Sequence, residues 1–170
     1  MILGMSLSLF TWVHVALSLV GIASGLLVLF GMLGGRKYAG LTALFLSATV
    51  LTSVTGFLFP FVQFGPSHIV GVISLVVLAA ALAALYGYGL EGAWRWIYVI
   101  GATVALYLNV FVGIVQAFQK LSFLQPLAPT QSEPTFIVAQ VAVLVIFVGL
   151  GAVALKSFHP AESIGMAPVA

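Results

Sequence analysis

The chain has 170 residues, of which 63% are hydrophobic and 5% are charged, with a formal net charge of +2. Soluble domains carry roughly 25% charged residues, so this composition excludes a soluble domain. The absence of cysteine excludes disulfides, thiolate metal sites and a cysteine nucleophile. Because the largest basic cluster is the pair Arg36 and Lys37, we expect no nucleic-acid partner.

Charged residues are missing from four long stretches of the chain. These stretches are apolar and cover residues 1–35, 38–90, 96–119 and 134–155. A membrane-spanning helix needs about 20 apolar residues, and the second stretch is long enough for two. The sequence therefore predicts an all-α fold, a polytopic transmembrane helical bundle with five spans.

The five spans are expected at about residues 6–33, 40–64, 66–88, 94–120 and 134–156. They form one domain over residues 1–160, and a flexible tail follows at 161–170. The first apolar run is too long for a signal peptide and lacks a positively charged start, so we expect a retained helix. The second and third spans are joined almost directly, which predicts a tight antiparallel hairpin.

Turn chemistry marks the start of the fifth span. Ser132 can cap the helix, Glu133 lies near the positive end of its dipole, and Pro134 suits its first turn. Across the loop that precedes this span, Lys120 and Glu133 are spaced to form an ion pair. An exposed pair contributes at most about 1 kcal/mol, enough only to order the loop.

The basic residues indicate an orientation. Four of them, Arg36, Lys37, Arg95 and Lys156, fall on one side of a five-span chain, and only Lys120 falls on the other. Loops rich in Lys and Arg stay in the cytoplasm. We therefore expect the N-terminus outside and the C-terminus in the cytoplasm, in a bacterial inner membrane.

Polar side chains gather toward the outer half of the predicted bundle. Hydrocarbon cannot satisfy their hydrogen bonds, so they are expected to face the bundle interior. The candidate ligand-binding residues are His14, Gln63, His68, Asn109, Gln116 and Gln140. The alternative is that polar and small residues, including the pair Gly21 and Gly25, serve helix packing.

The two histidines are the sharpest candidates in this set. Imidazole can ligate haem iron or bond to a quinone, so His14 and His68 are candidate ligands of haem b. His14 lies about eight residues into its span and His68 about two, and this difference in depth argues against paired axial ligands. In the alternative interpretation, His14 bonds to a neighbouring helix and His68 lies in a wet turn.

Several segments resemble those of a family of small uncharacterised bacterial polytopic inner-membrane proteins. The segments are residues 13–25, TVLTSVTGF at 49–57, PSH at 66–68, WRWIY at 94–98 and APTQSEP at 128–134. This resemblance implies a membrane bundle and no particular activity. The two histidines are also similar to the ligands of small haem-binding four-helix membrane proteins, whose further histidine pairs this chain lacks.

Two functions follow from these patterns. No predicted span contains a carboxylate, so an Asp or Glu proton relay is not expected, and no nucleotide-binding or hydrolase motif is present. We expect a non-enzymatic accessory or assembly component of a membrane complex, with a membrane-protein partner or a second copy of the chain. The alternative is a pocket for haem, a quinone or a small neutral solute in the outer half, or, less favoured, a solute channel built from several copies.

Overall fold

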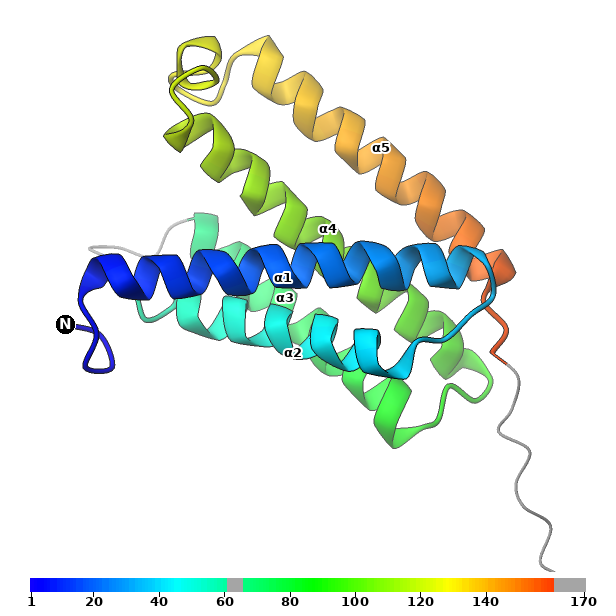
Figure 1. Ribbon diagram of the computed structural model, residues 1–170. Helices are drawn as coiled ribbons and strands as arrows, with labels where there is room; N and C mark the ends of the chain where they lie inside the picture. Colours follow the sequence, from blue (N-terminus) through cyan, green and yellow to red (C-terminus); the bar gives the residue numbers. More distant parts are fainter. Residues whose placement is uncertain (61–65, 161–170) are drawn as a thin grey trace, which may run out of the picture.

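The computed structural model describes residues 1–60 and 66–160, and these form an all-helical bundle (Figure 1). Within these two ranges there is no β-strand, only an isolated bridge between Ile2 and Met5. Five helices are long and apolar enough to cross a membrane. They are α1 (Leu7–Leu33), α2 (Ala39–Gly56), α3 (Pro66–Leu82) with its π-helical extension η1 (Ala83–Gly87), α4 (Ala93–Lys120) and α5 (Pro134–Ser157). The predicted all-α class is confirmed, and so is the predicted number of helices long and apolar enough to span a membrane.

The expected bounds of α1, α4 and α5 agree with the structure within one residue. At the start of α1, the Ser6 hydroxyl accepts a hydrogen bond from the Leu9 amide at 3.2 Å and caps the helix. α3 and η1 together cover the third span. The tail expected at 161–170 lies outside the described residues.

The second span is shorter than expected. α2 ends at Gly56, although the prediction continued it to residue 64. Pro60 explains the difference, because its ring would clash with the carbonyl of Gly56 and it has no amide to donate. The prediction that this span continues as a helix through residues 57–60 is therefore wrong. The turn of the predicted tight hairpin between the second and third spans falls on residues 61–65, which lie outside the described residues.

α4 is the central helix of the bundle. It contacts α1, α2, α3 and α5, and in Figure 1 it crosses behind α1 before it meets α5 in an antiparallel hairpin. In an 18-residue apolar stretch of α4, 44% of the residues are buried, compared with 11% in the corresponding stretch of α5. α5 is therefore the most weakly covered helix.

One end of the bundle carries Arg36, Lys37, Arg95 and Lys156, and we name it the basic end. Arg95, in the first turn of α4, donates to the carbonyl oxygens of Leu155 at 3.0 Å and Phe158 at 2.7 Å. Helix ends leave carbonyls without partners and carry partial negative charge, so a guanidinium there stabilises α5. The fully buried Phe158 ring packs 5.8 Å from the ring of Tyr98.

Glycines allow α1 to approach its neighbours. A Cβ at Gly25 would lie 2.6 Å from a methyl carbon of Leu106 on α4 and 2.8 Å from the Phe45 ring on α2. A Cβ at Gly21 would lie 2.9 Å from the Asn109 amide nitrogen. These contacts agree with the helix-packing interpretation of the glycine pair, because small residues let helices come close in lipid.

The close approach at Gly25 predicts the effect of one methyl group. Gly25→Ala should lower the free energy of unfolding by about 1–3 kcal/mol, because Leu106 and Phe45 are buried and cannot move aside. Unfolding in detergent, followed by circular dichroism, measures this change.

Gly149→Ala is the matched control for Gly25→Ala. No described atom lies within 4 Å of a Cβ at Gly149, which is also inside a helix. Alanine there should leave stability unchanged or raise it by up to about 1 kcal/mol, because alanine favours the helix. Equal stability of both variants would contradict the packing of α1 against α2 and α4.

Candidate functional site

His14 on α1 joins this helix to α2. Its Nδ1 lies 2.8 Å from the Thr55 hydroxyl oxygen. The Thr55 hydroxyl also lies 2.7 Å from the Leu51 carbonyl, and when it donates there the imidazole N–H is the donor to Thr55. The ring also meets Phe59 edge-on at 5.1 Å between centroids.

This bond determines the chemistry that His14 can offer. In the tautomer in which Nδ1 is protonated and donates to Thr55, Nε2 carries the lone pair and is the atom able to ligate a metal or accept a proton. Proteins orient metal-binding histidines through the other nitrogen in this way. The same bond also holds α1 against α2, and in the alternative interpretation this helix packing is the role of His14.

His68 has different neighbours. It lies in the first turn of α3, and its ring centroid is 5.8 Å from that of Phe57, just beyond the end of α2. His14 instead contacts Thr55 and Phe59. In the part of the chain that the structure describes, no three His, Asp or Glu side chains gather to hold a metal ion.

Asn109 on α4 is buried and bonds to α1. Its side-chain oxygen accepts from the Ser18 hydroxyl at 3.0 Å, and its amide donates to the Ser18 carbonyl oxygen at 3.4 Å. Gly21, one turn further along α1, leaves the space that the amide occupies. Asn109 therefore links the first and fourth helices.

Gln140 on α5 is buried against α4. Its amide donates to the Phe111 carbonyl oxygen at 3.2 Å, whereas its own oxygen has no hydrogen-bond partner among the described residues. Gln116 lies exposed on α4. Gln63 lies outside the described residues.

The structure thus distributes the predicted site residues over three helix pairs. His14 bonds to α2, Asn109 to α1 and Gln140 to α4, and each bond joins neighbouring helices. Thr55 and Ser18, which bond to His14 and Asn109, were not among the candidate residues. The same holds for Ser53 and Ser74, whose hydroxyl oxygens lie 3.0 Å apart. The sequence could have indicated these residues, because a hydroxyl within an apolar span needs a hydrogen-bond partner there.

The loop before α5 differs from expectation. Glu133, and not Ser132, is the residue at the N-cap of α5, with Pro134 following as expected. The Glu133 carboxylate accepts hydrogen bonds from the Thr130 hydroxyl at 2.8 Å and from the amides of Thr130 and Ser132, both at 3.1 Å. In the described structure these bonds replace the expected pair with Lys120.

These hydrogen bonds also affect the acidity of Glu133. Loss of water contact raises the pKa of the carboxyl, but the bonds from Thr130 and Ser132 lower it by more, so the pKa lies below its usual range. A carboxylate with a lowered pKa stabilises the folded loop at neutral pH. This contribution is lost as the pH falls through the lowered pKa.

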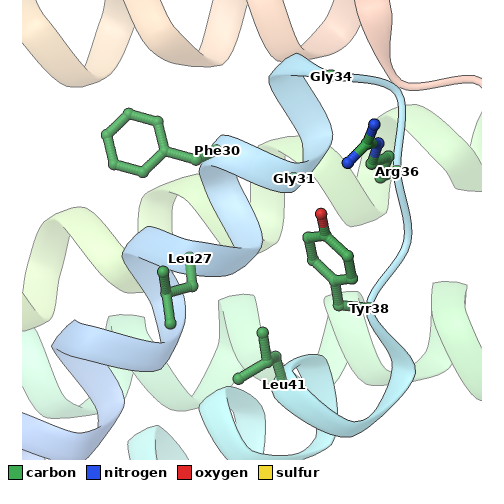
Figure 2. A pocket seen from close by; sticks show the side chains of 7 residues that line it. All are labelled: Leu27, Phe30, Gly31, Gly34, Arg36, Tyr38 and Leu41. Atoms are coloured by element: carbon green, nitrogen blue, oxygen red, sulfur yellow. The ribbon is translucent and has the colours of Figure 1, made fainter.

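One hollow in the described structure lies at the basic end, and none of the predicted site residues lines it. It has a volume of about 440 Å³ and is open to the surface. Figure 2 shows its lining residues, which are Leu27, Phe30, Gly31, Gly34, Arg36, Tyr38 and Leu41. The basic residues and the tyrosine at the end of an apolar span indicated only the charge and the boundary of the span, not the hollow.

The bond between Ser18 and Asn109 can be tested with a double-mutant cycle. Ser18→Ala and Asn109→Ala should couple by about 0.6–1.7 kcal/mol in the free energy of unfolding in detergent, the range found for hydrogen bonds between membrane helices. Ser47→Ala is the control partner, because the exposed Ser47 hydroxyl donates to carbonyls of its own helix. Its effect should add to that of Asn109→Ala.

Additive effects of Ser18→Ala and Asn109→Ala would contradict a structural role for this bond. The Asn109 amide would then be available to a ligand, as the alternative interpretation of the polar residues requires.

Comparison with protein-family models, with curated proteins and with solved structures finds no match to this chain. The function proposed below is therefore inferred from the contacts, burial and charges of the chain itself.

Proposed function

We propose that this chain is a multi-pass bacterial inner-membrane protein that acts as a non-enzymatic accessory or assembly component of a larger membrane complex. The weak coverage of α5 is the observation that carries this proposal. Only three residues of α5 are buried, and they follow one another at a spacing of seven: Gln140, Phe147 and Ala154. This stripe, flanked by half-buried residues such as Val143 and Leu150, faces α4 and α1. The exposed residues of the helix are left for lipid or a partner.

The uncovered side of α5 is shaped for a helix. It includes exposed small residues at Ala142, Gly149 and Ala152, beside exposed Val145 and Val153. In lipid, helices associate through small residues that allow close backbone approach, because apolar burial adds little there. This face thus fits a transmembrane helix of a partner protein.

The interior of the bundle supports the same role. The hydrogen bonds of His14, Asn109 and Gln140 connect neighbouring helices, as packing bonds do. Such bonds hold a scaffold in one arrangement. A rigid bundle with one open helix face is suited to hold a partner in place.

The proposed orientation places the basic end in the cytoplasm, with the N-terminus outside. Arg95 bonds to the end of α5, and a Cβ at Gly35 would lie 3.2 Å from the Ser157 carbonyl, so the two basic loops and Lys156 are neighbours. Grouping of basic residues at one end supports this orientation under the positive-inside rule.

Photo-crosslinking in native membranes tests the role of α5. Replacing Val145 with the photoreactive residue benzoylphenylalanine should give an adduct with another protein. The matched control is Val76 on α3, since Val145 and Val76 are 64% and 65% exposed. We expect the adduct at Val145 to be at least several-fold stronger, as measured by immunoblotting and mass spectrometry.

Three outcomes would contradict the proposal. Equal protein adducts at the two positions would indicate crowding, and adducts with lipid alone would indicate a helix without a partner. An adduct containing only two copies of this chain would indicate a homo-oligomer in place of an accessory subunit.

Single cysteines test the orientation, because the natural chain contains none and gives no background. Gln125→Cys, in the exposed loop before α5, should react with an impermeant maleimide in intact spheroplasts. Lys37→Cys, in the exposed loop after α1, should react only after permeabilisation. The reverse pattern, or labelling of both in intact spheroplasts, would contradict the orientation.

A further inference from the structure

The hollow at the basic end combines an apolar trough with a basic rim. Leu27 and Phe30 of α1 are 53% and 57% exposed, so this part of α1 is open to whatever fills the trough. Leu41 of α2 also lines it, and Arg36 and Tyr38 lie in the loop that joins the two helices (Figure 2). The trough is therefore apolar where it follows the spans and basic where the spans end.

Tyr38 shapes this rim. Its ring packs on Gly31, where a Cβ would lie 2.7 Å from a ring carbon, so a glycine is needed for the tyrosine to lie this close to α1. In Figure 2 the Tyr38 hydroxyl points toward the Arg36 guanidinium. Together they present hydrogen-bond donors above the trough.

The start of α2 adds positive potential at the same place. α2 begins at Ala39, directly after Arg36, Lys37 and Tyr38. The side chain of the N-cap residue Tyr38 makes no hydrogen bond to the first amides of this helix in the described structure. Uncapped amides at a helix N-terminus attract anions, and a guanidinium binds phosphate oxygens in a fork. The described lining of the hollow includes no Asp or Glu.

We propose that this hollow binds one anionic phospholipid. The phosphate lies on Arg36 and Tyr38 at the level of the headgroups, and an acyl chain follows the trough of Leu27, Phe30 and Leu41. The depth of the site fits this occupant, because its apolar walls belong to the spans and its basic rim to the adjoining loop. A lipid with a cationic headgroup would place its own positive charge against Arg36 and Lys37.

The test uses the full chain in detergent, with bound lipid measured by native mass spectrometry. Phosphatidylglycerol and phosphatidylcholine with the same acyl chains are added at equal concentrations, and inorganic phosphate is added as a competitor. We expect phosphatidylglycerol to bind roughly tenfold more tightly, a difference of about 1.4 kcal/mol. Inorganic phosphate should not displace it, because the trough contributes to binding.

Four variants separate the local site from general charge. Arg36→Gln should remove most of the preference for phosphatidylglycerol, and Tyr38→Phe should reduce it while keeping the ring on Gly31. Lys120→Gln removes the same charge at the opposite end of α4 and should leave the preference unchanged. Leu27→Trp should weaken binding by filling the trough without changing the charge. Thermal unfolding of each variant confirms that the bundle is intact.

Several results would overturn the proposal. Equal binding of the two lipids by the natural chain would remove the anion specificity. Equal losses in Arg36→Gln and Lys120→Gln would assign the effect to net charge alone. Displacement by inorganic phosphate would show a phosphate site without a lipid chain, and unchanged binding in Leu27→Trp would show that the trough is not occupied.

Discussion

Hydrocarbon offers no hydrogen bonds to a polar side chain, and the packing of this bundle follows from that constraint. A buried polar group is therefore stabilised by a partner on its own helix or on a neighbouring one, although the Thr52 and Thr103 hydroxyls and the Gln140 oxygen have none among the described residues. Ser18 and Asn109 meet across α1 and α4, His14 meets Thr55 across α1 and α2, and Gln140 reaches α4 from α5. These few bonds select the faces on which otherwise uniformly apolar helices pack.

The two ends of the bundle are held by different means. At the basic end, Arg95 in the first turn of α4 bonds to carbonyls at the end of α5, so this charge also fastens the open end of the α4–α5 hairpin. Near the opposite end, the Glu133 carboxylate organises the loop through Thr130 and Ser132 before α5 begins. α5 is thus fastened at both ends, although little of its length is covered.

The exposed face of α5 and the hollow beside Arg36 are two separate surfaces of the molecule. The first is apolar along the span and fits another helix, since small residues there permit close approach. The second combines an apolar trough with a basic rim and fits an anionic lipid. An accessory subunit that contacts a partner with one helix and a specific lipid at its basic end would link the assembly of a complex to its membrane.

The class, the number of spans and the basic end were determined by the sequence, because transfer into hydrocarbon depends on each segment's own composition and length. Pro60 also marked the end of α2 in the sequence, although the prediction followed the apolar stretch and continued the span past this residue. The tertiary structure decided which polar groups meet and that Arg36, Tyr38 and Leu27 share a hollow. These contacts depend on the rotation and crossing of helices, and spacing along one helix does not specify the face of another.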